Sequence, residues 1–161
     1  MSQEKYKHQL IILPEDKANI DIVNGFTKNQ NVKPRAIHVL REAGGWKDVV
    51  KQFPTDEAPK MRQYPKRMML LLIDFDNVTN RLELVQSEIP DDLKDRVFIL
   101  GSLHNPEQLK RDLGKSFEQI GEALAKDCSE NQSEFWGSEY LKHNQPELER
   151  MIVSVKPFLF N

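Results

Sequence analysis

Short apolar runs alternate with helix-spaced apolar positions along the first two thirds of the chain. Between the runs, apolar residues recur every three or four positions, as over 18–26 and 46–53, which is the spacing of an amphipathic helix. The runs themselves contain few or no charges, which is typical of strands buried on both faces of a sheet. They predict strands at 10–13, 36–40, 68–73 and 97–100.

The order of these elements is βαβαβαβ, followed by a helical C-terminal third. Amphipathic helices are expected at 117–128 and 148–155, and Asn105-Pro106 has the residues of a helix start. The segment 54–65 contains three prolines and is expected to be a surface loop. The pattern predicts an α/β fold with about four mostly parallel strands, flanked by helices and joined by right-handed crossovers.

The length of the chain suits one domain. It has 161 residues, of which 39% are apolar, enough to bury a core. We expect a single domain 1–161, in which 8–103 form the α/β core and 104–161 a helical extension packed on it. The apolar tail 158–160 is expected to pack back on the body or on a second subunit.

Charge and hydropathy narrow the partners. Lys and Arg number 23 against 25 Asp and Glu, so no overall positive charge attracts nucleic acid or anionic lipid. The N-terminal residues lack the apolar stretch of a signal peptide, and no apolar run is long enough to span a bilayer. We therefore expect a cytoplasmic protein without a membrane partner, and any contact with DNA or RNA to be local.

Acidic residues follow the first and third predicted strands. Asp74 and Asp76 come directly after the run 68–73, and Glu15 follows the run 10–13. If these two strands are neighbours, the three carboxylates converge on the carboxyl edge of the sheet, where open α/β sheets bind ligands. Repulsion and lost hydration make such a cluster tolerable mainly beside a cation, for which Mg²⁺ or Mn²⁺ is the natural choice. Such an ion can polarise a phosphoryl oxygen during phosphodiester cleavage or transfer.

A diglycine follows the second predicted strand. Gly44 and Gly45 precede a predicted helix, where backbone amide groups favour an anion. They are therefore weak candidates for binding a phosphate, and a plain turn is the alternative.

These motifs resemble the Toprim family, the catalytic domain shared by type IA and type II topoisomerases, bacterial primases, OLD-type nucleases and small ribosomal RNA maturases. The resemblance covers about residues 8–103 and depends on the strand that ends in Glu15, the glycine turn, and the Asp74-Phe75-Asp76 pair. It implies Mg²⁺-dependent phosphodiester chemistry, with Glu15 as acid/base or ligand and the two aspartates as ligands. Asp16 stands where family members usually have glycine, and Pro14 where they have an apolar strand residue.

Other enzyme classes place similar residues after a strand. Aspartates at a strand end commonly cap the following turn. In haloacid-dehalogenase phosphatases the first Asp of an Asp-x-Asp pair is the nucleophile, and Ser102 would then correspond to the second motif of that family. Nucleotide-sugar transferases and NYN-type nucleases use comparable acids, the former on a larger domain and the latter near the domain start.

A non-catalytic interaction module is the alternative from a different class. The C-terminal helices contain Phe135, Trp136 and Tyr140, which could face a protein partner or a second copy of the chain, although aromatic residues at helical spacing more often belong to the core. Basic residues of the same region could line a nucleic-acid groove, although nearby acids favour a solvated face; they are Lys110, Arg111, Lys115, Lys142 and Lys156.

Overall fold

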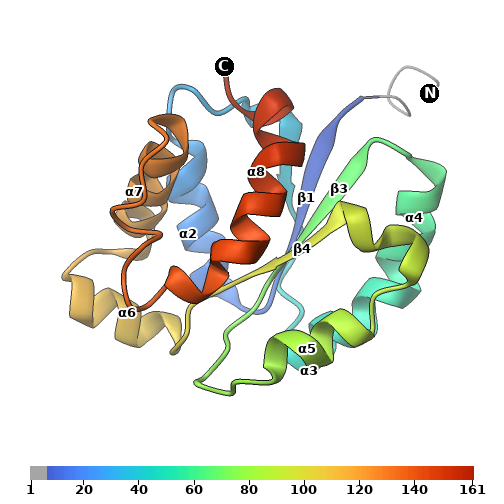
Figure 1. Cartoon of the computed structure of the whole chain (residues 1–161), viewed down its shortest axis with the longest axis horizontal. Helices are drawn as coiled ribbons and strands as arrows, with labels where there is room; N and C mark the ends of the chain where they lie inside the picture. The colour runs from blue at the N-terminus through green and yellow to red at the C-terminus, as the bar shows by residue number, and fades with distance from the viewer. Residues whose placement is uncertain (1–6) are drawn as a thin grey trace.

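The computed structural model describes residues 7–161 and has an α/β fold built on a four-stranded parallel sheet (Figure 1). The strand order is β2-β1-β3-β4, so the first and third strands are neighbours, with Leu13 opposite Leu71 and Pro14 opposite Leu72. This confirms the predicted fold class and brings the ends of β1 and β3 together. The strands are β1 (Gln9–Pro14), β2 (Ile37–Val39), β3 (Arg67–Leu72) and β4 (Val97–Leu100).

Helices cover both faces of the sheet (Figure 1). Residues that alternate along a strand enter two separate cores: Leu10 and Leu70 pack on one face, Ile11 and Leu71 on the other. Because both faces are buried, the strands are apolar throughout rather than alternating. One layer contains α2 (Lys17–Thr27), α6 (Pro106–Leu113), α7 (Phe117–Ser129) and α8 (Gln145–Leu159), and the other contains α3 (Trp46–Gln52), α4 (Ala58–Gln63) and α5 (Arg81–Ser87).

The expected proline-rich loop at 54–65 is wrong, because this segment is mostly helical. A π-helical turn, Phe53–Glu57, leads directly into α4. Pro54 and Pro59 each occupy one of the first two positions of its helical segment. A proline is tolerated there because the N–H that it lacks would have no partner within the helix. Phe53, Ala58 and Met61 are buried and attach the segment to the sheet.

The C-terminal region closes the β4 edge of the sheet. Asn144 Oδ1 accepts a hydrogen bond from the Gly101 amide, and Glu147 Oε1 accepts one from the Ile99 amide, each at 3.1 Å. These side chains therefore satisfy strand amides that would otherwise face outward at a sheet edge. The tail also packs on the body, because the Lys33 amide donates to the Leu159 carbonyl at 2.7 Å.

Helices α2 and α7 pack in close contact through two glycines. A Cβ atom at Gly25 would lie 1.9 Å from the Glu118 carbonyl oxygen, and one at Gly121 would lie 1.8 Å from the Ile22 carbonyl oxygen. The two backbones can approach this closely because neither glycine has a side chain.

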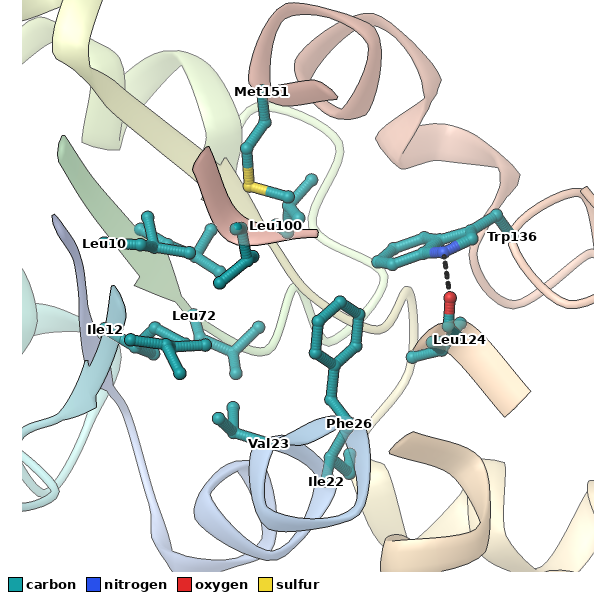
Figure 2. A pocket seen from close by; sticks show the side chains of 13 residues that line it. Leu10, Ile12, Ile22, Val23, Phe26, Leu72, Leu100, Leu124, Trp136 and Met151 are labelled. Carbon is teal, nitrogen blue, oxygen red and sulfur yellow. Dashed lines mark hydrogen bonds between the residues drawn. The ribbon is translucent and has the colours of Figure 1, made fainter. Parts of the chain in front are cut away.

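An apolar cavity of about 70 Å³ remains between these helices and the sheet (Figure 2). Val23 and Phe26 line it from α2, Leu100 from β4 and Met151 from α8, and the Trp136 ring closes one side. Trp136 is buried, and its indole N–H donates to the Leu124 carbonyl at 3.2 Å. This aromatic residue of the C-terminal third therefore belongs to the core. In the part of the chain that the structure describes, no helix is both long and apolar enough to cross a membrane.

Candidate metal site at the carboxyl edge

Glu15 and Asp74 meet where β1 and β3 end. Parallel pairing continues one residue beyond β1, because the Glu15 amide donates to the Leu72 carbonyl at 2.8 Å. The Glu15 side chain then turns toward β3, and its Oε2 accepts the Asp74 amide at 2.8 Å. Glu15 and Asp74 are 7% and 6% exposed, so both carboxyl groups are withdrawn from bulk water.

The start of α2 supplies two more polar groups to this edge. Asp16 is the N-cap of α2, and its Oδ1 accepts the Asn19 amide at 3.1 Å. Asn19 is buried, and its side-chain Nδ2 donates to Asp74 Oδ1 at 3.3 Å. An aspartate cap fixes the first helical turn, so the same interaction that begins the helix also positions Asn19 against Asp74.

Three carboxyl groups converge here. One oxygen each from Glu15, Asp16 and Asp74 lie within 4.8 Å of one another, an arrangement that could hold a metal ion. Burial, the side-chain hydrogen bond to Glu15 and the negative charges of Glu15 and Asp16 together raise the pKa of Asp74 to about 9, against a smaller opposing effect from Asn19. Asp74 therefore retains a proton at neutral pH when no cation balances the cluster.

Asp76 lies apart from this cluster. Its carboxylate pairs with Arg81 at 2.8 Å, and its side chain is about half exposed. Asp76 and Asn77 have positive φ angles of 47° and 60°, which divert the chain from the strand direction directly after Phe75. The structure thus brings two of the predicted acids together, Glu15 and Asp74, and places the third, Asp76, on Arg81.

Arg81 holds the loop after β3 in place. The same guanidinium nitrogen that binds Asp76 also donates to the Asp74 carbonyl at 2.8 Å. The guanidinium carbon lies 4.7 Å from the centre of the Trp46 ring, and the side chain is 10% exposed. Arg81 therefore fixes the backbone of Asp74 and neutralises Asp76.

The diglycine turn lies beside this site, but one of its amides is already used. The Gly44 amide donates to the Glu15 carbonyl at 2.9 Å, and Gly44 has a φ of 110°. Gly45 is the N-cap of α3, and the Asp48 carboxylate lies close to both glycines. An acid at this position competes with any phosphate for the remaining helix amides.

Ser102 lies one strand further along the same edge. Its hydroxyl donates to the His104 carbonyl at 2.5 Å, and the residue is buried. The His104 ring in turn contacts the Asn77 side chain, with 2.7 Å between Nδ1 and Nδ2. Since the hydroxyl is held by a backbone carbonyl, Ser102 stabilises the loop between β4 and α6.

Three residues of the site have no counterpart among the candidates taken from the sequence: Asp16, Asn19 and Arg81. Asp16 and Asn19 are spaced as an N-cap and the third helical residue, so the cap pattern was a usable signal. Arg81 had no such signal, because its role depends on how the loop 74–80 folds back.

Comparison with protein-family models, with curated proteins and with solved structures finds no match for this chain.

Proposed function

We propose that the carboxyl edge binds one divalent cation, Mg²⁺ or Mn²⁺, and that the protein uses it for phosphodiester hydrolysis or transfer on DNA or RNA, in the manner of a Toprim domain. The observation that carries this proposal is the convergence of the Glu15, Asp16 and Asp74 carboxyl groups at the ends of adjacent strands. Helix capping explains Asp16 alone, because Glu15 and Asp74 cap no helix.

The donor set fits a hard divalent cation. Carboxylate oxygens are the ligands that Mg²⁺ takes in proteins, together with water and substrate phosphate. The high pKa of Asp74 indicates that the cluster lacks positive charge. A cation there would replace the proton of Asp74, so binding should release protons and strengthen as the pH rises. When bound, the ion would polarise a phosphoryl oxygen and stabilise the charge that develops on it.

The residues of the chain have separable roles in this proposal. Asp16 and Asp74 are metal ligands, and Asp16 is the more exposed of the two. Glu15 has one oxygen on the Asp74 amide and the other free to hold the ion or to accept a proton from an attacking water. Asn19 and Arg81 are positioning residues, since they hold the side chain and the backbone of Asp74 respectively. Asp76 is outside the cluster and is therefore removed from the proposed ligand set.

The test measures ion binding and nuclease activity on the same proteins. Mg²⁺ and Mn²⁺ affinity is measured by calorimetry, and cleavage is followed on labelled single- and double-stranded DNA and RNA. The variants are E15Q, D16N and D74N, which keep the side-chain shape, and D48N is the matched control because Asp48 is exposed and outside the cluster. Each cluster variant should lose at least about tenfold in ion affinity and lose cleavage, while D48N should match the wild type.

Two results would contradict the proposal. Equal ion affinity in the wild type and all cluster variants would remove the metal site. Ion binding at the cluster without cleavage of any substrate would leave the site but refute the nuclease, and would favour a non-catalytic module.

A further inference from the structure

A second polar cleft lies away from the acidic cluster, near the amino ends of β1 and β3. Its volume is about 650 Å³, within the range of small-molecule sites. The acids follow the carboxyl ends of the same strands, so the two sites are at opposite edges of the sheet. The polar lining includes Gln9 and Arg67 at the strand starts, His38 on β2, and Glu57, Lys60 and Gln63 from the helical segment 53–63.

Glu57 is a buried acid with an unused acceptor. It is 3% exposed, and its Oε1 has no hydrogen-bond partner among residues 7–161. Its Oε2 lies 3.6 Å from the Lys60 ammonium, which forms an ion pair but is too long for a hydrogen bond. A buried carboxylate oxygen without a donor is costly, so this atom favours a ligand that presents N–H groups.

The local backbone also marks Glu57. It is the last residue of the π-helical turn Phe53–Glu57. Single π-helical turns are rare and occur often at functional sites. The turn places Glu57 one residue before α4, with its side chain in the lining of the cleft.

Cationic groups border the same cleft. Arg67 has its guanidinium 5.0 Å from the Tyr64 ring centre, and its buried Nε has no partner among the described residues. Lys60 has a side chain that is 53% exposed, so its ammonium can reach a ligand from solvent. An anionic group suits this border, as an N–H donor suits Glu57.

We propose that this cleft binds a guanine nucleotide, with the base against Glu57 and the phosphate against Lys60 and Arg67. A nucleotide carries both required groups, and the cleft has the size of a site for ligands of that class. Among the common bases, guanine alone has two adjacent N–H donors on one edge, which match the two oxygens of a carboxylate. Adenine presents an acceptor beside its amino group, which a carboxylate repels.

The test is calorimetric titration of the full chain with GMP, with AMP and inorganic phosphate as comparators, in EDTA so that no divalent ion takes part. GMP should bind at least about tenfold more tightly than AMP, and E57Q should lose at least about tenfold in GMP affinity. K60A should weaken GMP and phosphate alike. The matched control E83Q, an exposed acid on α5, and the acidic-cluster variant D74N should bind GMP as the wild type does.

The outcomes separate the parts of the proposal. No binding of GMP by a wild-type protein with normal thermal unfolding refutes the site. Equal GMP binding by the wild type and E57Q refutes the role of Glu57, and equal affinity for GMP and AMP refutes the guanine preference. Because D74N leaves this cleft intact, failure here is distinguishable from failure of the proposed metal site.

Discussion

Replacing Asp74 by asparagine should change how the stability of the protein depends on pH. The pKa of Asp74 is raised to about 9 from an ordinary value of 3.8. Between these values the folded protein keeps a proton that the unfolded chain releases. The free energy of unfolding therefore falls as the pH rises through this window, and the loss is complete above the folded-state pKa. Asparagine keeps the size of the side chain and its acceptor for Asn19 but does not titrate.

The magnitude follows from the width of the window. Each pH unit costs about 1.4 kcal/mol, so the three units from pH 5 to pH 8 give about 4 kcal/mol if Asp74 titrates alone in a rigid site. Glu15 shares the titration, and water entry softens the penalty, so we expect about half of this, roughly 2 kcal/mol. For a chain of this length that is a fall of about 4–8 °C in Tm.

The assay is thermal and urea unfolding of wild type, D74N and the control D48N at pH 5, 6, 7 and 8 in EDTA. Other groups titrate in all three proteins, so the difference between wild type and D74N isolates Asp74. D74N should gain stability relative to wild type as the pH rises, and Mg²⁺ at pH 8 should stabilise the wild type more than D74N. Parallel pH profiles of wild type and D74N would refute the reasoning.

Three further predictions concern packing. V23I adds one methyl group facing the apolar cavity and should stabilise the protein by about 0.8 kcal/mol in urea unfolding, whereas V49I, on the fully packed opposite face, should destabilise it; equal effects would contradict a cavity beside Val23. G121A should destabilise by at least about 2 kcal/mol despite its better helix propensity, because its Cβ would meet the Ile22 carbonyl, and a stabilised variant would show that the helices can separate at little cost. N144A should lower stability by about 1–3 kcal/mol and speed amide hydrogen exchange at Gly101; unchanged exchange would show that Asn144 does not protect the β4 edge.

The sequence by itself determined the parallel sheet, and the physical reason is local. Strands buried on both faces must be apolar at every position, so the runs 10–13, 68–73 and 97–100 identified β1, β3 and β4. The spaced helices between them required crossovers, and these required parallel strands. Burial also explains why the aromatic Trp136 belongs to the core. The segment 54–65 was misjudged because proline disrupts a helix interior but suits its first turn, and the sequence did not show where those turns begin.

Only the tertiary structure decided which acids share the site. Glu15 and Asp74 meet because β1 pairs with β3, a contact between residues far apart in the chain. Asp16 joins them as the cap of α2, whereas Asp76 turns away through a positive φ and pairs with Arg81. The sequence placed carboxylates at the correct edge because side chains after parallel strands gather there. Their final directions depend on the loop backbone and on partners from other elements, which no local pattern specifies.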